Sequence, residues 1–176
     1  RTQPWWRKNQ ARQNFTWYAN SLEQLAPTTR YTKVGFVPPD NYKPTNPSIS
    51  SHNGELWMIQ RTVNYTIRPD GSYDMNGDSA IITKNYLCKL DNDLNVVSHQ
   101  LINLPTDLPP PKYNLVIGFE DSRLFFWRGE PWCTSTVREL NAEGMCEIVL
   151  AKITGSGSGT CTLAEWRVIR SQFNEK

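Results

Sequence analysis

Two adjacent carboxylates, Glu120 and Asp121, open an apolar and aromatic run in the stretch "GFEDSRLFFWRGEPW", and Arg123 follows two positions later. Acids in such a place solvate a loop, form a structural ion pair with the arginine, or hold the proton of a catalytic site. These three interpretations stay open until the elements that present the two carboxylates are known.

A neighbouring carboxylate raises the pKa of an acid, and a neighbouring arginine lowers it. General acid chemistry needs the proton to be present near neutral pH, so Asp121 must be crowded by Glu120 or desolvated by nearby aromatic side chains. We therefore predict that Asp121 faces an open channel, and that Arg123 contacts Glu120 more closely than it contacts Asp121.

The composition of the chain narrows the class of protein. Its 176 residues, of which 38% are hydrophobic, suffice for one domain. The formal net charge is +2 and the lysines and arginines are scattered, so the basic stripe of a nucleic-acid-binding protein is missing. Apolar runs fall short of the ~20 residues of a membrane span, and the start of the chain has no signal-peptide pattern. We expect a cytoplasmic protein with neither nucleic acid nor a membrane span among its partners.

The four cysteines are widely spaced and form no Cys-x-x-Cys pair, and His52 and His99 are the two histidines. This spacing argues against a zinc site, and we expect no metal and no cofactor. Three cysteines lie in apolar runs that resemble strands, which favours buried free thiols. They are Cys88, Cys133 and Cys146.

The first segment has the pattern of a helix. Over residues 8–25 the apolar side chains recur at spacings of four and three, which makes one stripe on a helix, and Pro27 ends it. The stripe consists of Ala11, Phe15, Tyr18, Leu22 and Leu25. A proline-rich stretch, "VPPDNYKPTNP", follows. We therefore expect residues 1–45 to be a short helical segment and a connector.

Beyond the connector the pattern changes to period two. Short apolar runs are separated by Asn-Gly, Asp-Gly, Arg-Gly and Gly-Ser turns, and no helical pattern interrupts them. Crossover helices and a parallel sheet are therefore not expected. The runs are "LWMIQRTV", "SAIITKNYL", "NVVSHQLI", "RLFFW", "PWCTSTV", "CEIVLAKI" and "TLAEWRVI". They predict an all-β fold.

The sequence Gly-Glu-x-Trp occurs twice, at 54–57 and at 129–132, each time in the turn between the first two of four expected strands. Successive four-stranded meanders of one design are typical of β-propeller blades. We predict that 46–176 is a partial β-propeller of about two to three blades, with separate antiparallel sheets at 46–104 and 118–170. Chance recurrence of a common hairpin and a flat two-sheet sandwich are the alternatives.

Two blades do not close a ring, because propellers need at least about four. We expect that the chain is cut short, or that further blades or partner chains complete it. Open sheet edges and uncovered apolar faces favour association. We therefore predict that the isolated chain associates.

In this setting three stretches resemble the "N-P … R … G-x-E-D-P-R" pattern of five-bladed propeller glycosidases: "NPS" at 46–48, Arg61 after a hydrophobic strand, and "GFEDSR" at 118–123. The family is glycoside hydrolase family 130, the mannoside phosphorylases and their hydrolase relatives. The chain also resembles bacterial propeller domains found beside tetratricopeptide or glycosyltransferase regions. The resemblance covers roughly residues 46–170 and departs from the family at Ser122, where the family usually has proline.

The resemblance implies roles for individual residues. Asp121 matches the acid that protonates the leaving sugar through a hydroxyl relay, which makes it the expected catalytic residue. Arg61 matches an arginine that holds phosphate in the phosphorylases, and Asn46 matches an amide that contacts the sugar. Arg123 is expected to pair with the two acids and position them.

The substrate-binding set that the resemblance implies also includes Glu120 and Asn64. The implied function is a glycoside phosphorylase or hydrolase that acts on mannoside-type glycosides by single displacement, with inorganic phosphate as the co-substrate of a phosphorolysis. The alternative is a non-catalytic glycan-binding or scaffold propeller that partners a glycosyltransferase region.

These residues also have a structural interpretation. Glu120, Asp121 and Arg123 would then form an ion pair that ties neighbouring blades, and Arg61 would be a strand-end arginine in an ordinary salt bridge. Strand tyrosines and tryptophans are more often core residues than platforms for a sugar ring.

Overall fold

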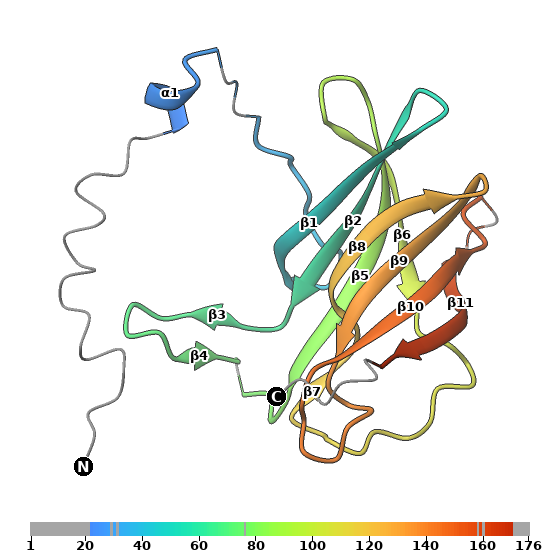
Figure 1. Ribbon diagram of the computed structural model, residues 1–176. Helices are drawn as coiled ribbons and strands as arrows, with labels where there is room; N and C mark the ends of the chain where they lie inside the picture. The colour runs from blue at the N-terminus through green and yellow to red at the C-terminus, as the bar shows by residue number, and fades with distance from the viewer. Residues whose placement is uncertain are drawn as a thin grey trace. The chain divides into compact units, whose positions relative to one another are not determined.

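Figure 1 shows the computed structural model, which describes residues 22–28, 30, 32–75, 77–157, 159 and 161–170. The chain divides into two compact units, 1–33 and 34–176, which are described separately. In the first, the described residues hold one short helix, α1 (Leu22–Leu25), which ends two residues before Pro27. The rest of the helix predicted over 8–25 lies outside the described residues. No helix in the described part of the chain has the length and apolar character of a membrane span.

The second unit is all-β, as predicted. Its main sheet has the strand order β1-β2-β5-β6-β11-β10-β9-β8, and the short β7 pairs with β5. The strands of the main path are β1 (Lys43–His52), β2 (Glu55–Val63), β5 (Ile81–Leu90), β6 (Val96–Asn103), β8 (Glu120–Trp127), β9 (Glu130–Val137), β10 (Glu147–Thr154) and β11 (Cys161–Ile169). The others are β7 (Val116–Ile117) and the hairpin of β3 (Thr66–Ile67) and β4 (Tyr73–Asp74), which projects from the sheet (Figure 1).

Two antiparallel meanders of four strands make up the sheet. The first meander consists of β1, β2, β5 and β6, and the second of β8, β9, β10 and β11. The repeated Gly-Glu-x-Trp forms the same turn in both: Asn53-Gly54 and Arg128-Gly129 each have two positive φ angles. Such turns match the twist of the strands they join. The hairpin predicted within 123–137 is confirmed as β8–β9.

The prediction of two separate sheets is wrong. The last strands of the two meanders, β6 and β11, pair in parallel, with Cys161 opposite Ile102 and Thr162 opposite Asn103. At the other end of the sheet, the Leu124 N–H donates to Ser48 Oγ at 2.9 Å and brings β8 beside β1. An unpaired strand edge leaves backbone groups without partners, and the β6–β11 pairing satisfies part of one such edge.

Each meander has two faces, because successive side chains of a strand point to opposite sides. We call the side that carries the tryptophan of Gly-Glu-x-Trp face A and the opposite side face B. By strand register, face A of the first meander carries Trp57, Ile59 and Leu87, and its face B carries Met58, Cys88 and Leu90. Face A of the second meander carries Phe125, Trp132 and Leu150, and its face B carries Leu124, Cys133 and Ala151.

The main hydrophobic core joins unlike faces of the two meanders. Ile59 and Leu87 come from face A of the first meander, and Leu124, Cys133 and Ala151 come from face B of the second. Equivalent faces therefore do not meet. We call this packing of face A of one meander on face B of the other head to tail. Their first strands lie side by side, as do their last strands (Figure 1).

A second, smaller core covers face B of the first meander. The segment before β1 lays Phe36 over Tyr86 and Cys88, and Val34 packs at its side. Phe36 is itself buried, with its ring centroid 5.3 Å from that of Tyr86. No described segment covers face A of the second meander in the same way.

The cysteine prediction is confirmed for two thiols and wrong for one. Cys88 and Cys133 are buried and free, whereas Cys146 is exposed. Cys146 stands one residue before β10 begins, so the apolar run that suggested burial starts after it. Cys161, at the start of β11, is buried.

Candidate functional site

The predicted sugar-binding amide and the predicted acid occupy the same place in the two meanders. Asn46 and Asp121 stand 75 residues apart, and each lies in a β-bulge of a first strand, where two residues face one on the neighbouring strand. Their φ angles are +41° and +49°. Asn and Asp tolerate this left-handed conformation better than most residues, which explains their place in the bulges.

The head-to-tail packing brings the two bulges together. Asn46 Nδ2 donates to Asp121 Oδ1 at 2.7 Å. The contact is open to solvent, because Asn46 is exposed and 42% of the Asp121 side chain is exposed. An amide and a carboxylate from two repeats thus form one polar spot at the start of β1 and β8.

Arg61 joins this spot from β2. It is 5% exposed, and its guanidinium spans both acids, with Nη1 2.6 Å from Asp121 Oδ1 and Nη2 2.5 Å from Glu120 Oε1. Nη2 also donates to Thr83 Oγ1 at 3.3 Å. Among the described residues, the buried Nε of Arg61 has no hydrogen-bond partner. A buried arginine with two acid partners fixes both carboxylates in place.

The predicted contact between Arg123 and Glu120 is wrong, because Arg61 takes that position. Arg123 lies opposite Thr134 on face A of the second meander, which turns away from the first, and it is exposed. In the described part of the chain it forms no ion pair, and its charge acts on the pKa of Asp121, which it lowers. Arg138 approaches Glu120 instead, with Nε 3.6 Å from Oε2.

The environments of the two acids push their pKa values apart. Burial raises the pKa of Glu120, against the opposing charges of Arg61 and Arg138. Burial also acts upward on the pKa of Asp121, but the hydrogen bond from Asn46 and the charge of Arg61 outweigh it, and that pKa lies below its ordinary value. The contacts of Asp121, the acid that reaches solvent, therefore favour its ionised form, which suits a hydrogen-bond acceptor rather than a proton donor.

Asn64, expected in the same site, serves the backbone instead. It is buried, and its amide donates to Asp78 Oδ2 at 2.7 Å and to the Ala80 carbonyl at 2.9 Å. Its Oδ1 accepts from the Ile82 N–H at 2.8 Å. These bonds close the base of the excursion that carries β3 and β4.

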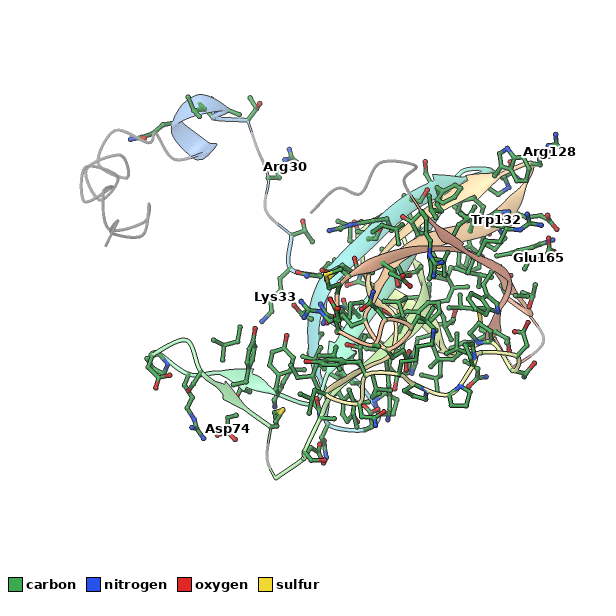
Figure 2. The ribbon with its side chains drawn as sticks, turned by 60° about the horizontal axis from the view of Figure 1, so that its bottom comes forward. Arg30, Lys33, Asp74, Arg128, Trp132 and Glu165 are labelled. Carbon is green, nitrogen blue, oxygen red and sulfur yellow. The ribbon has the colours of Figure 1, made fainter. Side chains whose placement is uncertain are left out.

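Tyr65 extends the polar spot toward that excursion. Its ring meets the Tyr73 ring edge to face, with centroids 4.7 Å apart, and Tyr73 is exposed. Burial raises the pKa of Tyr65, and the charges of Arg61, Glu120 and Asp121 act on it. An aromatic pair on a projecting hairpin therefore stands within electrostatic reach of the two acids. Figure 2 labels Asp74 on this hairpin.

Two further residues position the acids: Gly118, which the sequence interpretation named only as part of the motif at 118–123, and Glu139, which it missed. Gly118 has φ +97°, and a Cβ there would lie 2.3 Å from the Thr83 carbonyl oxygen, so only glycine fits. Its N–H donates to Glu139 Oε1 at 3.2 Å. Glu139 is 2% exposed, and burial raises its pKa. The repeat offset was the available signal, because Glu139 stands 75 residues after Asn64.

A separate cleft of about 180 Å³ lies toward the hairpin-turn end of β1 and β8. His52 and Phe126 stack there, with ring centroids 4.4 Å apart and planes 8° from parallel. Its one carboxylate, Glu55, is held by Lys89 at 2.5 Å. The cleft is aromatic but lacks the converging polar groups found around Arg61.

Among the described residues, no three His, Cys, Asp or Glu side chains gather as they would around a metal ion. Compared with protein-family models, with curated proteins and with solved structures, the chain matches none.

Proposed function

We propose that the protein is a carbohydrate-binding domain in which Asn46 and Asp121, positioned by Arg61, recognise a mannoside-type glycoside. The observation that carries this proposal is the convergence of an amide, a guanidinium and an ionised carboxylate on one solvent-open spot. Such groups hold the hydroxyls of sugars by directed hydrogen bonds. Tyr65 and Tyr73 offer aromatic surface beside them for the apolar face of a ring.

We also propose that the fold is a partial β-propeller in which each meander is one blade. In a sandwich of two repeats related by a two-fold axis, equivalent faces meet, whereas here face A of one meander packs on face B of the next. That order supports rotation about a common axis, which is the relation between propeller blades. Further blades or a glycosyltransferase region are the partners that this fold accommodates.

Binding fits the geometry better than catalysis. A general acid at Asp121 needs a proton near neutral pH, and the contacts from Asn46 and Arg61 favour the ionised form. Both terminal nitrogens of Arg61 already hold carboxylates, so a phosphate would have to displace one of them. The raised pKa of Glu120 favours the second candidate, a glycoside phosphorylase or hydrolase in which Glu120 supplies the proton.

The test is a calorimetric titration with methyl α- and β-mannoside, with the matching glucosides for comparison. We expect saturable mannoside binding that Asn46→Ala and Asp121→Asn each weaken by roughly tenfold or more, because each removes or neutralises a direct partner. Arg167→Ala is the control, since Arg167 is an exposed arginine of β11 and is not among the groups that act on Asp121. Folded wild type that binds no mannoside would rule the proposal out.

Turnover distinguishes the second candidate. Release of reducing sugar or consumption of phosphate by the wild type, lost by about 10²–10⁴-fold in Glu120→Gln with sugar binding intact, would favour the enzyme. If Asp121→Asn shows that loss instead, Asp121 is the general acid, although its pKa is lowered.

A further inference from the structure

Face A of the second meander is an uncovered apolar surface. Phe125, Trp127, Trp132 and Leu150 line a hollow of about 280 Å³ on it. Trp127 is 52% exposed, and Ile148 and Ile169, paired on the same face, are also exposed. Trp127 is the exposed member of the hollow, because Trp132 is buried at 8% exposure and Phe125 is half-buried. Ile148 and Ile169 lie at the other end of the strands. An exposed tryptophan over an apolar hollow marks an interaction surface.

The molecule itself shows what such a face packs on. Face A of the first meander, with Trp57 and Ile59, covers face B of the second, with Cys133 and Ala151. Trp57 and Trp132 stand at the same place in their repeats. Because face A around Trp57 packs on face B of the neighbouring meander, we expect the equivalent face around Trp132 to pack on a face B as well.

The matching face B exists in the first meander. Met58 and Cys88 pair across β2 and β5 in the same way that Cys133 and Ala151 pair across β9 and β10. In this structure that face is covered by Val34 and Phe36, which come from a segment without strand pairing in the described residues.

We propose that face A of the second meander docks on face B of the first meander in a second copy of the chain. The docking copy takes the place of residues 34–36, which act as a competing cap. Contact between unlike faces is heterologous, so it repeats the head-to-tail order found within one chain and lets copies add in sequence. The inference is independent of sugar binding.

Charged groups lie on the docking surface as well as at its edge. By strand register Lys152 stands opposite Trp132, and Arg123 and Arg167 stand in the same row as Leu150. Arg128 lies over the Trp127 ring at 4.6 Å. Lys152 is held between Glu130 at 2.6 Å and Glu165 at 3.2 Å. Figure 2 shows Arg128, Trp132 and Glu165 on the same side of the unit. The apolar centre of the docking surface is therefore the hollow around Trp127, and the ion-paired Lys152 lies beside it.

Sedimentation velocity of the full chain over a concentration series tests the proposal. We expect the wild type to self-associate, Trp127→Lys to abolish association, and Phe36→Ser to bring it to about tenfold lower concentration by removing the cap. Val97→Lys is the control, because Val97 is an exposed apolar residue of β6 outside the surface. Val34→Ser provides a milder removal of the cap should Phe36→Ser melt the fold.

A mixing experiment separates this arrangement from a symmetric dimer. The double variant Phe36→Ser/Trp127→Lys keeps only an open face B, and wild type diluted until it is monomeric offers face A. Head-to-tail docking predicts that the two form a one-to-one complex, although neither associates alone at that concentration. Failure to form the complex would overturn the proposal. So would a wild type that stays monomeric at every concentration, or association that Trp127→Lys leaves unchanged.

Discussion

The first and second meanders share a frame but use it differently. Both have four antiparallel strands, the same turn with two positive φ angles, and a bulge near the start of the first strand. At the bulge, the first meander has Asn46 and the second has Asp121. One repeat thus supplies an amide donor and the other a charged acceptor. The packing of the two meanders brings donor and acceptor into contact and forms the candidate site.

Asn64 and Glu139 are a second pair of equivalent positions at which the two meanders carry different residue types. Asn64 and Glu139 both follow the second strand of their meander, both are buried, and both accept a backbone N–H. Asn64 also donates two hydrogen bonds, whereas Glu139 is a carboxylate that burial disfavours in its charged form. The shared backbone of the two meanders places a hydrogen-bond acceptor for a backbone N–H at this position. The residue type decides whether that hydrogen bond depends on pH.

The largest expected effect comes from the arginine that joins the two meanders. Arg61→Ala leaves the largely buried Glu120, whose side chain is 14% exposed, without its main partner, so we expect a loss of about 3 kcal/mol in the free energy of unfolding. Urea denaturation measures it. Arg123→Ala, an exposed arginine two residues after Asp121, should change stability by less than about 0.5 kcal/mol. Equal effects of the two substitutions would mean that Arg61 is not the link.

A smaller effect is expected at Glu139. Its folded pKa is raised, so the stability that it contributes is fully present below its unfolded pKa and is lost as pH rises through the folded value. Glu139→Gln keeps an acceptor for Gly118 and removes the charge. It should stabilise the protein by about 1 kcal/mol at neutral pH and have no such benefit in acid.

The converse substitution sharpens the comparison. Asn64→Asp removes both amide donations and sets a carboxylate against Asp78, so it should destabilise the protein at neutral pH. Thermal melts of both variants from acid to neutral pH measure the two trends. A Glu139→Gln variant that gains no stability relative to the wild type as pH rises would contradict the assignment of a buried, ionisable Glu139.

The smallest effect is expected at the turns. Arg128 and Asn53 hold equivalent left-handed positions, with φ +53° and +50°, and Asn suits that conformation better. Arg128→Asn should gain roughly 0.5 kcal/mol from the backbone and lose a similar amount from the Arg128 contact with Trp127. The net change in denaturation midpoint is therefore expected near zero, whereas Asn53→Arg should destabilise, because it puts an arginine in a left-handed position that Asn suits better.

The repeat and the all-β fold could be predicted from the sequence, because turn residues and period-two runs are local signals. The packing of unlike faces could not, since strand alternation is the same for either face. The choice of Arg61 over Arg123 followed from that packing: face A of the first meander turns toward the second, and face A of the second turns away. Glu139 was missed because its contact with Gly118 spans a loop that sequence periodicity does not describe.

A double-mutant cycle between Asn46 and Asp121 tests most directly the central claim, that the two repeats meet at their equivalent bulges. Asn46→Gly and Asp121→Gly remove the side chains without straining either left-handed backbone. Chemical denaturation of the wild type, both single variants and the double variant should yield a coupling energy of about 0.5–1.5 kcal/mol. Additivity within about 0.3 kcal/mol would contradict the claim, because side chains that do not touch contribute independently.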